Sequence, residues 1–108
     1  MKYTSENLIK VINEMISITE WDNSDWASWL IKCKKELENS DYHGIERLLG
    51  GYGGMGSFND LVVGQSHDED GNFVWRKGYK RKNNQLSGLR SKAYEIAQYI
   101  KHNHEISP

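Results

Sequence analysis

A glycine-rich run from Gly50 to Gly56 constrains the fold more than any other stretch, because five of the chain's ten glycines fall within it. Glycine has no Cβ and tolerates positive φ, so such a run marks backbone that turns sharply or that another segment approaches closely. Helical periodicity precedes the run, and a hairpin signal follows it. We interpret it as the joint between a helical half and a β-containing half, with a tight turn that carries Tyr52, Met55 and Phe58 into the core.

Apolar spacing predicts three helices before this joint. Residues 8–19 and 26–37 carry apolar side chains at helical spacing, and Thr4 or Ser5 is expected as the first N-cap. A third, short helix is expected over 42–49, capped by residues 39–41. Gly50 should end it as a C-terminal glycine in the left-handed conformation.

The second half of the chain predicts a β-hairpin and one long helix. Phe58 and residues 61–63 indicate a strand, Asp70-Gly71 is a hairpin-turn dipeptide, and residues 72–75 indicate the return strand. The polar, basic segment 80–84 is expected to be a loop, and a helix should follow over 86–100 with Asn84 as its N-cap. The sequence therefore predicts an α+β fold, predominantly helical, forming a single domain over residues 1–108.

The single cysteine and the modest apolar runs indicate where such a chain works. Cys33 has no second cysteine to pair with, and it lies on the apolar stripe of its helix, so we expect a buried structural thiol in a reducing compartment. No apolar run approaches the length of a membrane span, and the N-terminus lacks a signal-peptide core. We expect a soluble, cytoplasmic protein.

The glycine run also has the spacing of a nucleotide-binding motif. Residues 51–56 match G-x-G-x-x-G, but a dinucleotide site needs a strand before the glycines and a helix after them, and here the order is reversed. Ser57, Asn59 and Asp60 follow directly, and short polar side chains of this kind cap backbone groups in turns. We therefore expect a structural turn, without nucleotide or other cofactor.

Two histidine-containing segments could suggest metal ligands. The segment 67–70, His-Asp-Glu-Asp, lacks the glycine and glutamate spacing of a calcium loop, and we interpret it as a charged hairpin tip. His102 and His104 lie near the C-terminus, where they form an incidental pair. The sequence predicts no metal site.

The near-neutral net charge of −1 conceals two oppositely charged halves. Up to Asp70 the chain has six lysines and arginines and thirteen acidic residues. From Gly71 onward it has eight lysines and arginines and only two acidic residues. The segment 75–82 mixes aromatic and basic residues, which suits nucleic acid, but the acidic half and a sequence pI near 6.4 argue against that partner. An acidic helical half suits competition for an electropositive cleft, as inhibitors of nucleases use.

The chain resembles a small uncharacterised family of bacterial proteins. Three segments carry the resemblance: residues 26–30, residues 44–49, and the run from Tyr52 to Val62 with its Gly-Gly-Met-Gly-Ser-Phe-Asn-Asp core. The signature residues are Gly50, Gly51, Gly53, Gly54, Met55, Gly56, Ser57, Phe58, Asn59 and Asp60. The family brings no catalytic residues with it. Small single-domain proteins of this type are also similar to immunity proteins of bacterial toxin–immunity systems, including contact-dependent growth inhibition.

These observations lead to the hypothesis of a non-catalytic immunity protein that neutralises a cognate toxin domain, such as a nuclease, by covering its active or substrate-binding face. The residues expected to meet this partner are Asp22, Asp25, Glu36, Glu38, Asp41, Glu46, Trp21 and Trp75. One alternative is a small ligand-binding domain or enzyme that uses Ser57, Asn59, Asp60 and His43 around the glycine turn. Another is a nucleic-acid-binding module that uses the basic segment 76–82. The oligomeric state stays open.

Overall fold

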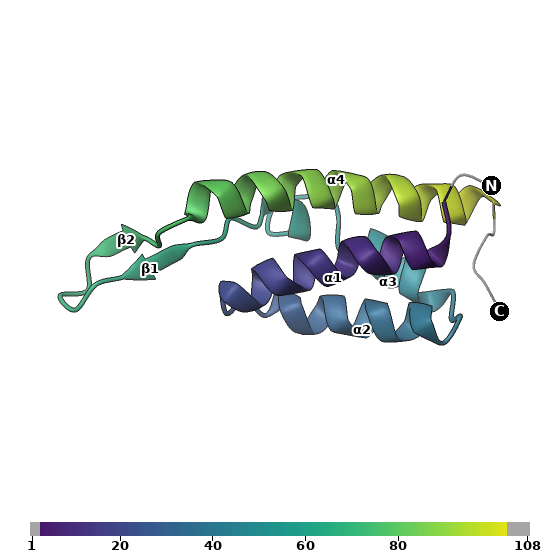
Figure 1. Ribbon diagram of the computed structural model, residues 1–108, viewed down its shortest axis with the longest axis horizontal. Helices are drawn as coiled ribbons and strands as arrows, with labels where there is room; N and C mark the ends of the chain where they lie inside the picture. Colours follow the sequence, from purple (N-terminus) through teal and green to yellow (C-terminus); the bar gives the residue numbers. More distant parts are fainter. Residues whose placement is uncertain (1–2, 104–108) are drawn as a thin grey trace.

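The computed structural model describes residues 3–103 and shows a helical bundle from which a β-hairpin projects (Figure 1). Helix α1 spans Ser5–Trp21, α2 spans Trp26–Glu38, and α3 spans His43–Gly50. A 3-10 turn at Phe58–Asp60 precedes strands β1 (Gln65–His67) and β2 (Phe73–Trp75), and α4 spans Tyr79–Asn103. This confirms the predicted α+β, mainly helical fold with a hairpin and a long C-terminal helix.

The predicted helical stripes form the core. Leu8, Ile12 and Met15 of α1 are fully buried, as are Leu30 and Cys33 of α2. Further core residues come from α3, α4 and the segment between them: Ile45, Leu48, Phe58, Val63, Leu86, Ala93, Ile96, Ala97 and Ile100. Thr4 caps α1 as expected, because its hydroxyl accepts from the Asn7 N–H while the Asn7 side chain accepts from the Thr4 N–H.

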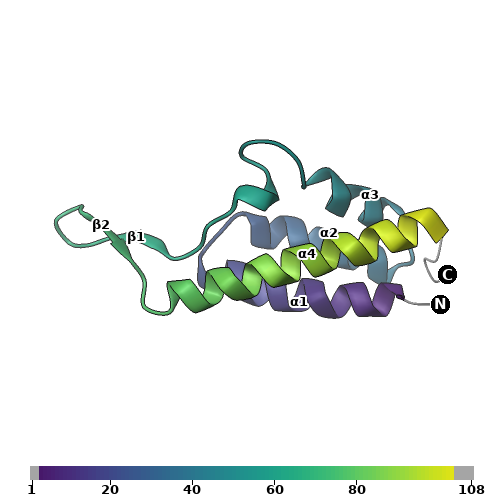
Figure 2. The ribbon, with the colours of Figure 1, turned by 90° about the horizontal axis from the view of Figure 1, so that it is seen from above.

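The molecule is elongated, with extents of 52 × 24 × 20 Å, because the hairpin extends beyond the bundle. Helix α4 lies along the bundle and leads at its N-terminal end into the hairpin (Figures 1 and 2). We call β1, the connecting residues 68–72 and β2 the arm. Within the described residues, no helix combines the length and the apolar character needed to cross a membrane.

The glycine run joins the two halves, but two details of the prediction are wrong. Gly50 is the last residue of α3 and Gly51 its C-cap at φ −80°, so the helix ends in right-handed geometry; positive φ occurs later, at Gly53 and Gly56. Met55 is fully exposed, whereas Phe58 is buried. The loop that follows α3 bulges from the bundle (Figure 2).

The strand predicted near Val63 is also displaced. Residues 58–60 form a 3-10 turn, and β1 begins only at Gln65. The reason is that the backbone of buried Val63 is satisfied by a side chain: Asn83 accepts from the Val63 N–H at 2.9 Å and donates to the Val63 carbonyl at 2.9 Å. A side-chain amide therefore supplies the hydrogen bonds that a neighbouring strand would have supplied.

The hairpin turn is longer than Asp70-Gly71 predicts. Asp68 and Asn72 form the last backbone bond of the ladder, and the Asp68 carboxylate accepts from the N–H groups of Asp70 and Asn72, both at 2.9 Å. The carboxylate thus organises a five-residue connection, in which Gly71 adopts φ 82°.

The basic segment 80–84, predicted as a loop, is helical. Helix α4 begins at Tyr79, so Asn84 lies within the helix and is not its N-cap. Asn83 donates to the Tyr79 carbonyl at 2.9 Å while it holds Val63. Residues 79–84 are exposed or half-buried, so this part of α4 has no apolar stripe from which a helix could be predicted.

Candidate functional site

The arm carries a row of aromatic side chains on one of its faces. Gln65 pairs with Trp75, and His67 pairs with Phe73, so these four residues share a face of the two-stranded sheet. Phe73 contacts His67 with ring centroids 6.2 Å apart and Trp75 at 5.0 Å, both edge to face. Trp75 then stacks on Tyr79 of α4 at 4.4 Å with an interplanar angle of 13°. We call His67, Phe73, Trp75 and Tyr79 the aromatic row.

The aromatic row is open to solvent. Phe73 is 51% exposed and Trp75 is 42% exposed, whereas Phe58 in the bundle is fully buried. Large rings that pack on each other but not on the core form the kind of surface that protein interfaces use.

The base of the arm is fixed to the end of α1. The Arg76 guanidinium lies 3.9 Å from the centroid of the Trp21 ring and donates to the Trp21 carbonyl. The Asp22 carboxylate accepts from the Gly64 N–H at 2.7 Å. Strand β1 is therefore tied to α1 through Asp22, and β2 through Arg76, so the aromatic row has a defined position relative to the bundle.

The predicted partner-binding residues divide into two groups. Asp22 and Trp21 hold the arm, Glu36 forms an ion pair with Arg47 at 2.6 Å, and Asp41 accepts from the backbone N–H of His43 at 2.9 Å. Asp25, Glu38, Glu46 and Trp75 are exposed. In the described part of the chain, the Asp25, Glu38 and Glu46 carboxylates make no ion pair or hydrogen bond, so they are available to a partner.

The pKa directions agree with this division. The Arg47 side chain holds the pKa of Glu36 below its usual value, and the His43 backbone N–H does the same for Asp41. Both carboxylates already stabilise the fold in their charged form. Burial raises the pKa of the Cys33 thiol to about 12, so this fully buried side chain is neutral, as the sequence predicts for a structural cysteine.

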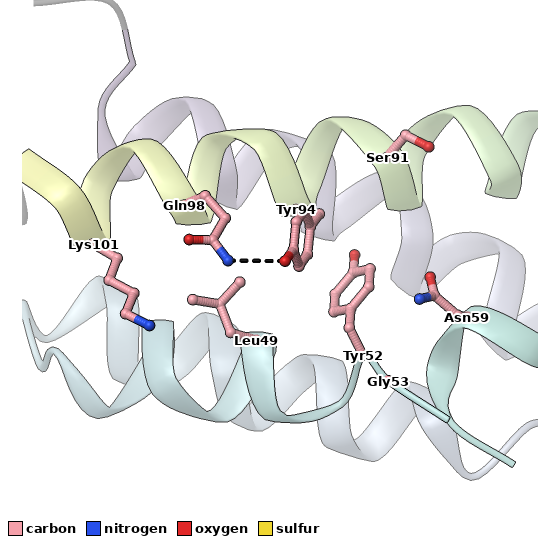
Figure 3. Close-up of a pocket in the computed structure, with 8 residues that line it drawn as sticks. All are labelled: Leu49, Tyr52, Gly53, Asn59, Ser91, Tyr94, Gln98 and Lys101. Atoms are coloured by element: carbon pink, nitrogen blue, oxygen red, sulfur yellow. Dashed lines mark hydrogen bonds between the residues drawn. The ribbon is translucent and has the colours of Figure 1, made fainter. Parts of the chain in front are cut away.

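A groove of about 550 Å³ lies between the glycine loop, the end of α3 and α4 (Figure 3). The Tyr52 and Tyr94 rings meet there at 5.1 Å; the Tyr52 hydroxyl donates to the Arg90 carbonyl at 2.8 Å, and Gln98 donates to the Tyr94 hydroxyl at 2.9 Å. Asn59 also lines this groove.

The polar residues after the glycines do not converge on this groove. Ser57 donates to the Gly53 carbonyl at 3.2 Å, and Asp60 accepts from the Gly56 N–H at 2.9 Å, so both stabilise the loop itself. His43 lies at the start of α3, 2.8 Å from the Asp41 carboxylate. The structure therefore brings only Asn59 to the groove, and the Ser57 hydroxyl bonds to a carbonyl instead of a base.

The described residues contain no group of three or more histidine, cysteine or acidic side chains that could hold a metal ion. The hairpin-tip acids Asp68, Glu69 and Asp70 lie in solvent. His102 is an exposed residue near the end of α4, and His104 lies outside the described residues.

Sequence reasoning missed Phe73 and Tyr79 as members of one surface. The alternation of Phe73 and Trp75 within β2 was the available signal, because residues two apart in a strand share a face. The ring of Tyr79 joins them only because α4 begins earlier than its apolar pattern indicates. Arg90, which donates to the carbonyls of Phe58 at 3.0 Å and Leu61 at 2.7 Å, gave no signal.

Comparison with known proteins identifies one family. Residues 19–72 match the family described as Domain of unknown function (DUF6966), a span from the end of α1 through the glycine run to the arm. No curated protein and no solved structure matches the chain. The match covers half of the sequence and agrees with the expectation of an uncharacterised small domain family. The chain therefore belongs to the DUF6966 family, whose function is unknown.

Proposed function

We propose that this protein is a non-catalytic, immunity-type binding protein that neutralises a cognate bacterial toxin domain by covering its active or substrate-binding face. The observation that carries the proposal is the aromatic row, which is held in place at its base yet packs on no part of the core. Its rings would enter the partner's surface as anchors, and the exposed acids of the helical half would face the partner's cations.

The energetics of interfaces favour this use of the arm. Truncating a central Trp or Tyr typically costs about 2 kcal/mol or more of binding free energy, because such rings bury much area and lose little side-chain entropy. Trp75 is already ordered by stacking on Tyr79 before any partner arrives. Preorganisation of this kind reduces the entropy lost on binding.

The exposed carboxylates complete the surface. Asp25 lies at the start of α2, near the end of α1 that anchors the arm, and its carboxylate makes no ion pair or hydrogen bond within the described residues. Glu38 and Glu46 lie elsewhere on the helical half and are equally available. A nuclease cleft that binds phosphates is electropositive, so acidic side chains would steer the two proteins together and speed their association.

Catalysis at the glycine loop has less support. Ser57 and Asp60, which would have to act on a substrate, are bonded to the backbone of their own loop. His43 is paired with Asp41 at the start of α3.

Nucleic-acid binding has one specific observation in its favour. Lys77, Lys80 and Arg81 are exposed beside the stacked pair of Trp75 and Tyr79, and cations next to aromatic rings suit a single strand. The acidic residues at the arm's tip and the pI near 6.4 oppose it.

The test is co-expression with the product of the neighbouring upstream gene as the candidate toxin, followed by size-exclusion chromatography and an assay of toxin activity. We expect a complex and loss of toxin activity. Trp75→Ala should weaken binding about 30-fold or more, corresponding to about 2 kcal/mol. Tyr94→Ala is the matched control, because Tyr94 is also 42% exposed but lies outside the aromatic row.

Three results would contradict the proposal. The first is the absence of any complex with the toxin domain. The second is equal binding by the Trp75→Ala and wild-type proteins. The third is salt-dependent binding of a single-stranded RNA oligonucleotide that disappears in a Lys80→Glu, Arg81→Glu variant, since this result would favour the nucleic-acid alternative.

A further inference from the structure

The outer edge of β2 presents backbone hydrogen-bonding groups that the arm does not use. The Arg76 N–H donates to the Gly64 carbonyl at 2.8 Å, and the Asp68 N–H donates to the Asn72 carbonyl at 2.9 Å. Hydrogen-bonded and non-hydrogen-bonded pairs alternate along an antiparallel ladder, so Val74 bonds inward to Ser66. Phe73 and Trp75 therefore direct their N–H and C=O groups away from β1, toward an edge that pairs with no strand among the described residues.

This edge lies on a sheet of only two strands, and all three residues of β2 are exposed. A lone hairpin in water is marginally stable, whereas three or more strands with an apolar face are stable together. Phe, Val and Trp are also strong strand formers. The edge of β2 is thus a template for another strand, and the arm would gain stability from it.

The distribution of charge along the arm indicates which strand would pair with the outer edge of β2. The connection at its tip carries Asp68, Glu69 and Asp70, and the base of β2 leads into Lys77, Lys80 and Arg81, all exposed. An antiparallel neighbour with the same sequence would place its acidic tip beside this basic base, and its basic base beside this acidic tip. The arm is therefore complementary in charge to a second copy of itself.

We propose that two copies of this chain pair through the outer edges of β2 to form a four-stranded antiparallel sheet. The two-fold axis passes between the Val74 residues, and Phe73 of each copy exchanges backbone hydrogen bonds with Trp75 of the other. The Phe73 and Trp75 rings of the two copies then lie opposite each other on one face, where cross-strand aromatic pairs stabilise the sheet. This register places Glu69 and Asp70 beside the start of the other copy's α4.

The outer edge of β1 does not offer the same complementarity. Its outward groups belong to Gln65 and His67, which are polar. Two-fold pairing there would place Asp68 opposite Gly64 of the second copy, where the Asp22 carboxylate is bonded. Two carboxylates would meet, so charge repulsion disfavours this edge.

The decisive experiment is cysteine cross-linking of the full chain. In the proposed register the Val74 residues form a non-hydrogen-bonded pair with Cα atoms about 4.5 Å apart, within the range of a disulfide. We expect Val74→Cys to give a disulfide-linked dimer on mild oxidation. Ser66→Cys is the matched control, because Ser66 is Val74's partner on β1 and lies away from the axis. Cys33 is buried and should not interfere.

A second measurement tests the charges without cysteine. Analytical ultracentrifugation of the wild-type chain over a wide concentration range should show a monomer–dimer equilibrium that weakens as salt rises. Reversing Glu69 and Asp70 to lysine should raise the dimer dissociation constant about tenfold or more, and reversing Lys77 and Lys80 to glutamate in the same chain should restore it. Circular dichroism confirms that each variant is folded.

Several outcomes would overturn the proposal. The proposal is wrong if the wild-type chain is monomeric at every concentration. It is also wrong if Ser66→Cys cross-links as fast as Val74→Cys. Failure of the fourfold charge variant to recover dimerisation removes the charge argument. These measurements use the purified chain alone, so a missing toxin partner would leave their result unchanged.

Discussion

Two neighbouring glycines, Gly50 and Gly51, should respond in opposite directions to the same substitution. Gly50 is the last residue of α3, and a Cβ built there has no atom within 4 Å. A Cβ on Gly51 would lie 2.2 Å from Cζ2 and 2.6 Å from Cη2 of Trp29. Gly50 therefore tolerates a methyl group, while Gly51 allows the loop backbone to approach the Trp29 ring.

The magnitudes follow from these surroundings. Gly50→Ala should raise the free energy of unfolding by about 0.5–1 kcal/mol, because alanine loses less backbone entropy in a helix. Gly51→Ala should lower it by about 1–3 kcal/mol, the usual cost of forcing an extra carbon into a packed site. At about 4–8 °C per kcal/mol for a domain of this size, the two melting temperatures should differ clearly.

Urea unfolding followed by tryptophan fluorescence and circular dichroism measures both effects. A Trp29→Phe background tests the cause, since the smaller ring removes the atoms that the Gly51 methyl group meets; the cost of Gly51→Ala should fall there. Had Gly50 been the left-handed cap that the sequence predicts, alanine would destabilise at that position. A destabilising Gly50→Ala, or a neutral Gly51→Ala, would refute the structural reasoning.

Three further predictions concern the core and its charges. Phe58→Ala should lower the free energy of unfolding, measured in urea, by about 3–5 kcal/mol, because Phe58 is buried. Phe73→Ala, at an exposed ring, should lower it by about 0.5 kcal/mol or less. Similar losses for the two variants would be inconsistent with the difference in burial. Iodoacetamide should label Cys33 of the native protein only as fast as the protein opens, because the thiol is buried and its pKa is about 12; rapid labelling would show that it is accessible. The pKa of Glu36 is lowered on folding, so its contribution is present above its unfolded-state pKa and is lost as the pH falls through the folded value. The unfolding free energy of Glu36→Gln should therefore fall less than that of the wild type on acidification, and equal slopes would argue against the Arg47 pair.

The local pattern of the sequence was sufficient for most of the elements. Apolar residues recurring at helical spacing identified α1, α2, α3 and the centre of α4, because a helix that buries one face requires apolar residues at that spacing. The Thr4 cap and the hairpin around Gly71 were also predictable, because both depend on side chains a few residues apart.

Contacts between distant residues decided what the pattern could not show. Asn83 forms hydrogen bonds with the backbone of Val63, twenty positions away, and these bonds replace those of the expected strand. Asn83 itself lies in a helical turn that the sequence pattern does not predict. Arg90 holds the carbonyls of Phe58 and Leu61 and so directs the chain that leaves the glycine loop. Neither role can be predicted from the residue type, because a polar side chain that bonds to a distant backbone group produces no periodic pattern in the sequence.

The candidate site shows the same division. The sequence alone determined that Trp75 lies on a hairpin strand and that acidic and basic residues separate along the chain. Only the tertiary structure decided that Trp21, Asp22 and Glu36 are used within the fold, while the rings of Phe73 and Trp75 stay in solvent. The physical reason is that local periodicity reports whether a face can be buried, whereas exposure depends on whether another segment arrives to cover it.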